Sequence, residues 1–335
     1  MKEYLSNGNS YEKTSIISTK EDVILLSEMI RIRQIEEAIA FRYKEDEMKT
    51  PVHLMIGQEA TVVAACSQMT REDKVFCSHR THGVYLAKGG DVKAMMLELY
   101  GRVGGCSGTR GGSMHLIDKK VGIDGVSAIV GGIVPIATGA SFAHKGKNIL
   151  TTVFFGDAAI EEGVVSESFN MAALWKLPIV FFCENNFYSV CTPLHQRQLQ
   201  ESLIEKARAQ GVYSIKIDGN NVYEVMAAVK EAKDRALKGE GPTFIEAVVY
   251  RWLAHGGSED DTWTGYRTEN EVKNWKNICP IKTFEKFLLK HKVITQEEIQ
   301  ELWRSEKERI DRLIEEVRKA PIPDVSEVLE YVYAK

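Results

Sequence analysis

The chain has 335 residues, of which 44% are hydrophobic and 27% are charged, so it can bury a large core in one sizeable α/β domain or in two smaller ones. Its net charge of −4, without a long run of either sign, argues against nucleic acid or a membrane surface as a partner. No apolar run approaches the ~20 residues that span a bilayer, and residues 1–20 lack the apolar segment of a signal peptide. We therefore expect a cytoplasmic protein, and six cysteines without a CxxC pair fit a reducing compartment.

The first third of the chain is predicted to be mainly helical. Residues 1–18 are polar and aperiodic, and we expect them to form a flexible tail. The sequence TKED at 19–22 is typical of a capping box, and it precedes apolar residues at helical spacing. Residues 59–69 and 91–101 have the pattern of two further helices.

A regular alternation of strands and helices follows. Short apolar, β-branched or aromatic runs predict strands at 74–77, 149–155, 178–183, 213–217 and 243–250. Helical patterns lie between them at about 135–146, 161–176 and 221–238. This alternation is typical of a parallel sheet with helices on both faces.

The alternation ends after Tyr250, where a polar loop leads to a charged helical tail that begins at about residue 269. We therefore expect one α/β domain over residues 19–330. It is predicted to contain a doubly wound, mostly parallel sheet, with helical extensions at its N- and C-terminal ends.

Two of the predicted strands are followed by polar residues, Asp157 in FFGDAAIEEG and Asn186 in IVFFCENNF. Ligands of an open parallel sheet bind beyond the carboxyl ends of its strands, so these side chains share a crevice if the two strands are neighbours. A carboxylate and an amide oxygen suit Mg²⁺, and the small residues Ala158 and Ala159 at the start of the next helix let a phosphate approach the backbone amides. The sequence thus predicts a cradle for Mg²⁺ and diphosphate, although Asp157 as a simple N-cap and Asn185-Asn186 as a turn remain an alternative.

The unit GDAAIEEGVVSESFNMAALWKLPIVFFCENNFYSV, residues 156–190, resembles the thiamine-diphosphate motif, which begins with Gly-Asp-Gly and ends with Asn-Asn. Further motifs follow the order seen in the alpha subunits of thiamine-diphosphate-dependent 2-oxoacid dehydrogenases of the pyruvate and acetoin types. They are HLMIGQEA, SHRTHGVYLAKG, GCSGTRGGSMHL, IVGGIVPIATGAS and the loop at 251–268. The resemblance covers about residues 25–330.

The resemblance implies a role for each matching position. The metal ligands would be Asp157, Asn186 and the backbone carbonyl of Tyr188. The residues around the cofactor would be Arg80, Gly156, Ala158 and Ala159 at the diphosphate, Val130 at the aminopyrimidine ring, and His255. His82 and His255 would line the reaction centre, where imidazole suits proton transfer near neutral pH. Four other histidines, His53, His144, His195 and His291, are expected to have no catalytic role.

Two departures from the family pattern concern the loops. Ala158 stands where the motif has glycine, and the segment Leu253-Ala254-His255-Gly256 retains only one of the two histidines of the family and no phosphorylatable serine at 256. The glutamate that activates thiamine belongs to the beta subunit in this family, so we do not assign that role to Glu59. The resemblance therefore implies an α2β2 assembly with the cofactor at the interface.

The predicted function is decarboxylation of a 2-oxoacid, or cleavage of an acyloin such as acetoin, with transfer of the acyl unit to the lipoyl carrier of an acyltransferase. The diverged histidine loop leaves open a carboligase in which an aldehyde is the acceptor. A Mg²⁺-dependent phosphate hydrolase is more remote, because no nucleophile or P-loop lysine is apparent. A catalytically silent subunit is suggested only by Ala158.

Overall fold

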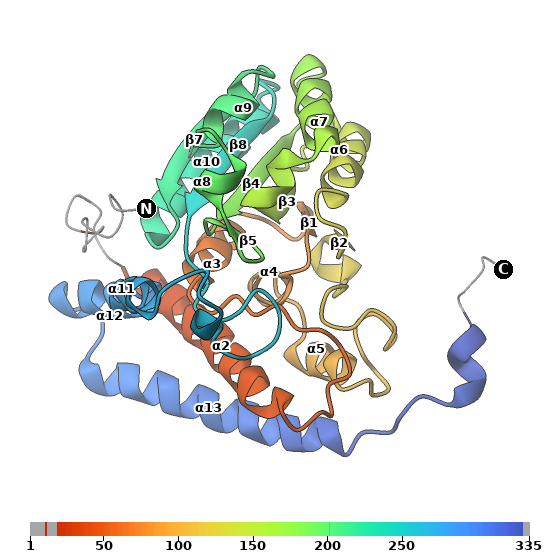
Figure 1. Ribbon diagram of the computed structural model, residues 1–335, viewed down its shortest axis with the longest axis vertical. Helices are drawn as coiled ribbons and strands as arrows, with labels where there is room; N and C mark the ends of the chain where they lie inside the picture. Colours follow the sequence, from red (N-terminus) through yellow and green to blue (C-terminus); the bar gives the residue numbers. More distant parts are fainter. Residues whose placement is uncertain (1–10, 12–18, 201, 331–335) are drawn as a thin grey trace.

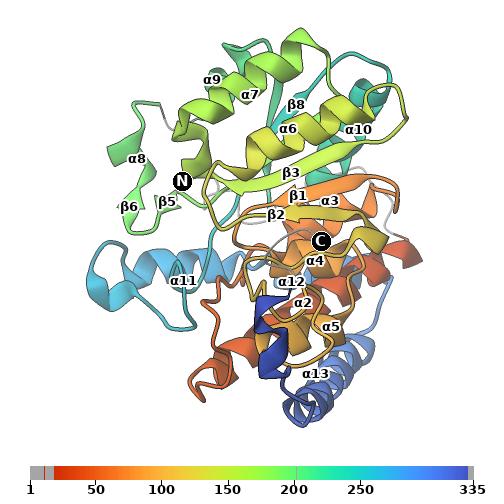
Figure 2. The ribbon, with the colours of Figure 1, turned by 90° about the vertical axis from the view of Figure 1, so that its right-hand side faces the viewer.

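A six-stranded parallel sheet forms the centre of the molecule, with strand order β2-β1-β3-β4-β8-β7 (Figures 1 and 2). The computed structural model describes residue 11 and residues 19–330 except residue 201. The sheet strands are β1 (Lys74–Cys77), β2 (Ile123–Val126), β3 (Thr151–Gly156), β4 (Ile179–Asn185), β7 (Tyr213–Asp218) and β8 (Thr243–Val248). A short antiparallel pair, β5 (Tyr188–Ser189) with β6 (Thr192–Pro193), lies outside it. The predicted doubly wound α/β fold is confirmed.

Helices cover both faces of this sheet, as Figure 2 shows edge-on. The α-helices are α2 (Lys20–Tyr43), α3 (Glu59–Ser67), α4 (His82–Ala87), α5 (Val92–Leu99), α6 (Ile133–His144), α7 (Gly163–Leu174), α8 (Leu194–Arg197), α9 (Ile204–Arg208), α10 (Val222–Leu237), α11 (Glu269–Asn277), α12 (Pro280–Lys290) and α13 (Gln296–Arg318). Short 3₁₀ helices are η2 (Lys119–Val121), η3 (Asp157–Glu161), η4 (Thr262–Thr264) and η5 (Val325–Leu329). Helices α6, α7 and α9 lie on one face, and α3 and α10 lie on the other (Figure 2).

The apolar strands divide their side chains between two cores. Val153 and Phe155 of β3 pack in the core formed with α6 and α7, whereas Phe154 between them packs in the core formed with α2, α3 and α10. Phe181 and Phe182 of β4 alternate in the same way. Because successive strand residues point to opposite faces, a strand buried on both sides has a continuous apolar run. This burial explains why β3 and β4 were easy to predict.

Strand β2 and helix α4 were not predicted. The sequence of β2, IDGV, contains a charged residue and a glycine and lacks an apolar run. Helix α4 has only six residues and includes Gly83, where a Cβ atom would lie 1.7 Å from Sδ of Met55. Glycine therefore lets α4 pack closely against the neighbouring segment, an arrangement that only tertiary contacts reveal.

The two ends of the chain pack on the central unit. The predicted capping box is present, with the Thr19 backbone N–H donating to the Asp22 carboxylate at 2.7 Å. Most of the predicted tail at 1–18 lies outside the described residues, but Tyr11 is buried, with its ring 5.6 Å from that of Phe284. At the other end, α13 packs lengthwise along α2 (Figure 1). In the part of the chain that is described, no helix is both long and apolar enough to cross a membrane.

Trp275 of α11 anchors the C-terminal helices to the sheet. Its ring is 2% exposed and stacks on Tyr250, with centroids 5.2 Å apart and an angle of 5° between the planes.

We predict that Trp275→Ala lowers the free energy of unfolding by about 3–5 kcal/mol, because it removes a large buried ring. The matched control is Trp263→Ala, whose ring is 82% exposed and whose loss should change stability by less than about 0.5 kcal/mol. Equal effects in urea denaturation would contradict this anchoring role.

Candidate functional site

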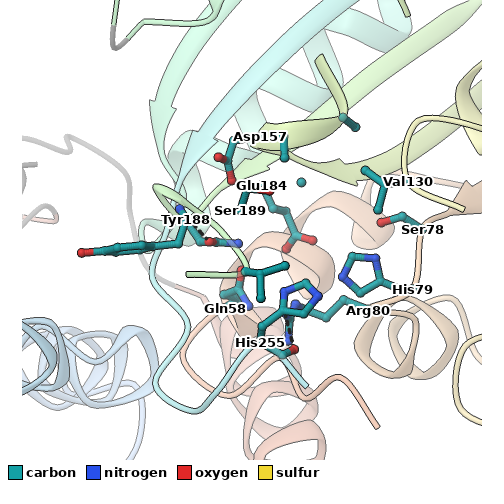
Figure 3. A pocket seen from close by; sticks show the side chains of 15 residues that line it. Gln58, Ser78, His79, Arg80, Val130, Asp157, Glu184, Tyr188, Ser189 and His255 are labelled. Carbon is teal, nitrogen blue, oxygen red and sulfur yellow. Dashed lines mark hydrogen bonds between the residues drawn. The ribbon is translucent and has the colours of Figure 1, made fainter. Parts of the chain in front are cut away.

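A cavity of about 100 Å³ opens beyond the carboxyl ends of β1, β3, β4 and β8 (Figure 3). Its lining comprises Gln58, Ser78, His79, Arg80, Val130, Gly156, Asp157, Ala158, Ala159, Glu184, Asn186, Tyr188, Ser189, Val190 and His255. This is the edge of a parallel sheet at which ligands usually bind. The cavity brings together all the site residues predicted from the sequence except His82.

The parallel pairing of β3 with β4 brings Asp157 close to Asn186. Gly156 pairs with Glu184, so the residues that follow on the two strands leave the sheet side by side. The backbone of Asn186 lies close enough to interact with the Asp157 carboxylate, and the Asn186 side-chain oxygen accepts a hydrogen bond from Tyr188 N–H at 3.2 Å. Two oxygen-bearing side chains and the Tyr188 segment thus share one end of the cavity.

The negative charge of the Asp157 carboxylate is only partly neutralised by neighbouring groups. The residue is 1% exposed, and burial raises the pKa of its carboxyl group, an effect that the neighbouring Arg197 partly offsets. A divalent cation would favour the ionised carboxylate. The carboxylate of Asp157, the side-chain oxygen of Asn186 and the carbonyl of Tyr188 are hard oxygen donors that fit Mg²⁺.

Arg197, which the sequence analysis did not single out, reaches the same carboxylate from α8. Its guanidinium group forms ion pairs with Asp157 and with Glu161 of η3. A metal ion that binds Asp157 must therefore compete with this arginine. No motif in the sequence pointed to the contact, since residues 157 and 197 meet only through the fold.

The helix predicted at 161–176 is confirmed as α7, Gly163–Leu174. Ala158 and Ala159, which were expected at the start of that helix, lie instead in the 3₁₀ helix η3. Ala158 does not adopt a positive φ, so alanine fits here without the strain that a left-handed backbone would cause. A Cβ atom at Gly156 would meet no other atom within 4 Å. Open space therefore lies next to the backbone where a phosphate group is expected.

Arg80 and Glu184 face the middle of the cavity. Arg80 donates to the backbone carbonyls of Leu54 and, at 3.2 Å, His255, and burial lowers the pKa of Arg80 to about 10. Burial also raises the pKa of Glu184 to about 7, although its carboxylate accepts a hydrogen bond of 2.6 Å from the Thr61 hydroxyl. The guanidinium of Arg80 is therefore held by neutral carbonyl groups, which leaves its charge available to an anion.

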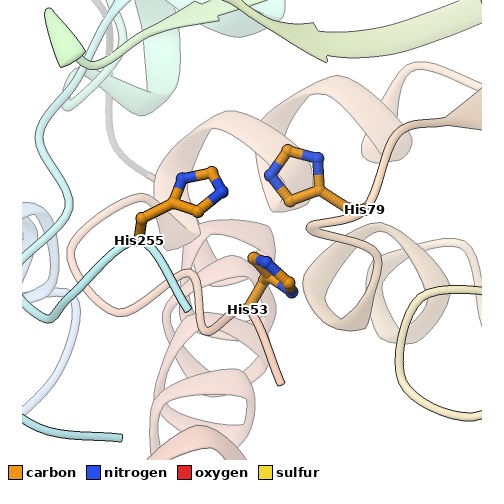
Figure 4. A group of neighbouring side chains, drawn as sticks. All are labelled: His53, His79 and His255. Atoms are coloured by element: carbon orange, nitrogen blue, oxygen red, sulfur yellow. The ribbon is translucent and has the colours of Figure 1, made fainter. Parts of the chain in front are cut away.

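His79 and His255 line the other end of the cavity, and the ring of His53 lies next to both of them (Figure 4). The ring centroids of His53, His79 and His255 are 4.7–5.1 Å apart. Burial, and then the charge of Arg80, lower the pKa of His53 to about 4, of His79 to about 2 and of His255 to about 3. All three rings are therefore neutral near pH 7, the form in which imidazole accepts a proton or binds a metal.

The positions of His53 and His82 differ from what was expected. His53 was expected to have no catalytic role, but its ring lies against His255. His82 is fully buried, with its ring nitrogens 2.7 Å from Glu36 and 2.7 Å from the Ser113 hydroxyl, and it does not line the cavity. The reason is that α4 begins at His82 and turns this ring into the core, whereas His79, which was not singled out, precedes the helix and faces the cavity.

Two buried arginines hold the loop that carries His255. Arg267 bonds to Asp261 at 2.7 Å and donates to the carbonyl of Arg251 at 2.8 Å. Arg251 donates in turn to the carbonyl of Val190 at 2.7 Å, which links this loop to the segment after β4. The loop is therefore held by internal bonds even though its sequence departs from the family pattern.

Glu59 has a structural role. Its carboxylate receives two hydrogen bonds from Arg33, at 2.6 and 2.9 Å, and one from the backbone N–H of Gly57 at 3.0 Å. It is fully buried and does not line the cavity. The expectation that Glu59 does not activate the cofactor is consistent with this geometry.

The low pKa of His79 predicts a loss of stability in mild acid. The unfolded chain protonates this histidine near pH 6.5, whereas the folded chain keeps it neutral down to about pH 2, so protons favour unfolding as the pH falls below 6.5. Between pH 7 and pH 5 the wild-type protein should lose about 1–2 kcal/mol more of its free energy of unfolding than His79→Asn does. His291→Asn, at an exposed position, is the control and should follow the wild type. Identical pH profiles for wild type and His79→Asn in urea denaturation would contradict the burial of this ring.

Comparison with known proteins identifies the family of the chain. The family model described as "Dehydrogenase E1 component" matches residues 27–326. The chain is 34% identical to the pyruvate dehydrogenase E1 component subunit alpha of Rickettsia felis, over 94% of this chain and 97% of that protein. It is 36% identical to the mitochondrial subunit alpha of Saccharomyces cerevisiae, over 93% of this chain and 74% of that protein, and 34% identical to that of Solanum tuberosum, over 95% and 81%. The chain therefore belongs to the dehydrogenase E1 component family, the thiamine-diphosphate-dependent 2-oxoacid dehydrogenases.

Proposed function

We propose that this chain is the alpha subunit of a thiamine-diphosphate-dependent dehydrogenase that decarboxylates pyruvate or a similar small 2-oxoacid and passes the acyl unit to a lipoyl carrier. The observation that carries the proposal is the placement of Asp157 beside Asn186, with the cation of Arg80 facing the same cavity. A metal-diphosphate group needs both features, since the cation binds oxygen ligands and the diphosphate needs positive charge and free amides.

Within the proposed site, Asp157, Asn186 and the carbonyl of Tyr188 would hold Mg²⁺. Arg80 and the backbone amides of residues 156–159 would bind the diphosphate, and the exposed Val130 at the rim would meet the aminopyrimidine ring. When bound, thiamine diphosphate supplies the nucleophilic carbon and the electron sink that decarboxylation requires. The protein contributes position, charge and proton transfer.

The histidine cluster is proposed to handle protons at the substrate. His53, His79 and His255 are neutral at physiological pH, so each can accept a proton from the substrate and return it. Arg80 lies beside them and disfavours their protonated forms. We therefore assign the reaction centre to these three rings, with His79 and His53 in the place first expected for His82.

A partner subunit is proposed to complete the site. The apolar side chains of Ile129 (73% exposed), Ile136, Phe142 and Leu174 form an exposed surface that runs from the cavity rim along α6 to the end of α7. An apolar surface of this extent typically marks a protein interface. Since Glu59 is bound by Arg33, we propose that a beta subunit in an α2β2 assembly covers this surface and supplies the carboxylate that activates thiamine.

The carboligase alternative rests on the loop before His255. The segment Leu253-Ala254-His255 retains only the second of the two histidines of the family pattern, which changes the surroundings of the acceptor. Turnover with lipoamide or an artificial electron acceptor, but not with aldehydes, would exclude it. An acyltransferase with lipoyl groups is accordingly the proposed partner of the dehydrogenase.

Two substitutions around the metal site should act in opposite directions. In the complex of this chain with its beta subunit, Asp157→Ala should raise the Kd of thiamine diphosphate in the presence of Mg²⁺ by at least about tenfold, because it removes a metal ligand. Arg197→Ala should lower that Kd by up to about tenfold, because it removes the cation that competes for Asp157. Calorimetric titration measures both values, and Arg208→Ala, an exposed arginine that pairs with Glu205, is the control. Weaker binding by Arg197→Ala would show that the arginine binds the cofactor instead.

Because the site is proposed to need a beta subunit, we expect the isolated chain to be inactive. The purified chain supplied with thiamine diphosphate, Mg²⁺ and an artificial electron acceptor should show no turnover, whereas the complex with the beta subunit should decarboxylate a 2-oxoacid. Comparison of kcat/KM for pyruvate, branched 2-oxoacids and acetoin identifies the substrate class. Robust turnover by the chain alone would contradict the incomplete site.

A further inference from the structure

Gln58 carries a buried polar group that the fold leaves unsatisfied. It lies at the N-cap of α3, is 0% exposed and lines the cavity (Figure 3). Neither the nitrogen nor the oxygen of its side-chain amide has a hydrogen-bond partner. An N-cap side chain commonly bonds to the first turn of its helix, but that of Gln58 makes no such bond.

The backbone around Gln58 is held from several directions. Its N–H donates to Met55 O at 2.9 Å, and its carbonyl accepts from the Thr61 hydroxyl at 2.7 Å. On either side, the Glu59 carboxylate binds Gly57 N–H, and a Cβ atom at Gly57 would lie 2.5 Å from Trp252 Nε1. The side chain is thus fixed at the cavity wall by contacts that do not involve its own amide.

A buried amide without hydrogen-bond partners destabilises the folded chain unless a ligand bonds to it. An unsatisfied buried donor or acceptor destabilises the folded state, and the Gln58 amide has both kinds of group. Natural proteins keep such groups where they serve binding or catalysis. The unpaired amide therefore points to a hydrogen-bonding ligand in this cavity.

The surroundings favour an anionic oxygen as that ligand. The positive end of the α3 dipole lies at Gln58, and the guanidinium of Arg80 lines the same cavity with only carbonyl partners. The amide nitrogen of Gln58 adds two neutral donors to these positive groups. The carboxylate of Glu184, which also lines the cavity, accepts a hydrogen bond of 2.6 Å from the Thr61 hydroxyl.

We propose that Gln58 is an additional anion-binding residue, whose amide N–H groups donate to a diphosphate oxygen of the cofactor beside Arg80. The inference rests on the proposed function, because it takes the diphosphate as the occupant of this cavity. The carboxylate of the substrate is the other possible source of the same anionic chemistry, and the experiment separates the two.

The test uses the complex of the full chain with its beta subunit and compares wild type, Gln58→Leu and Gln58→Glu. Gln68→Leu is the matched control, since Gln68 lies at the exposed end of the same helix. Calorimetry gives the Kd of thiamine diphosphate and, separately, of inorganic pyrophosphate, each with Mg²⁺. Thermal unfolding without ligand and the KM of the 2-oxoacid complete the set.

Gln58→Leu should raise both Kd values by about tenfold, Gln58→Glu should raise them further by charge repulsion, and Gln68→Leu should leave them unchanged. Without ligand, the Tm of Gln58→Leu should equal or exceed that of the wild type, because the variant removes an unsatisfied polar group. A residue with a merely structural role would lower the Tm instead. Unchanged Kd values in Gln58→Leu overturn the proposal, and an effect confined to the KM of the 2-oxoacid assigns Gln58 to the substrate carboxylate and overturns it as well.

Different results would contradict the proposed function and the proposed role of Gln58. If the wild-type complex binds pyrophosphate in a Gln58-dependent manner but not thiamine diphosphate, the anion site stands and the proposed function falls. If the wild type binds thiamine diphosphate and Gln58→Leu binds it equally well, the proposed function stands and the role of Gln58 falls.

Discussion

The parallel pairing of β3 with β4 is the constraint on which the rest of the site depends. Because Gly156 lies opposite Glu184 in this register, Asp157 and Asn186 leave the sheet together and become nearly inaccessible to solvent. Burial raises the pKa of Asp157, so the folded chain maintains a carboxylate that a cation would stabilise. A shift of this register would move Asp157 away from Asn186 and disrupt the site.

Charge is distributed unevenly along the cavity. One end contains the carboxylate of Asp157, the middle contains the cation of Arg80, and the far end contains the neutral imidazoles of His79 and His255, with His53 packed against them. Burial favours neutral forms, and the positive charge of Arg80 lowers the histidine pKa values further. From one end to the other, the cavity is therefore suited to binding a metal ion, binding an anion and transferring protons.

Specific buried contacts outside the cavity hold its lining residues in place. The pair of Arg33 with Glu59 fixes the start of α3, and the contacts of Arg267 with Asp261 fix the loop of His255. Replacing one member of a buried pair leaves an uncompensated charge, so these residues stabilise the site without touching a ligand. The exposed apolar side chains along α6 lie next to the same cavity rim, so the proposed partner subunit would lie close to the cavity.

The sequence by itself determined most of the sheet, strands β1, β3, β4, β7 and β8. Strands β3 and β4 are buried on both faces, so their apolar runs are continuous, and the polar residues that interrupt them, Asp157 and Asn186, mark the site directly. Only the tertiary structure decided the inward turn of His82, the cluster of His53 with His255 and the unpaired amide of Gln58. The physical reason is that these features depend on contacts between residues far apart in the chain. Such contacts set the orientation and burial of a ring and the competition between Arg197 and a metal. Local sequence patterns indicate only which segments are buried and at which residues those segments end.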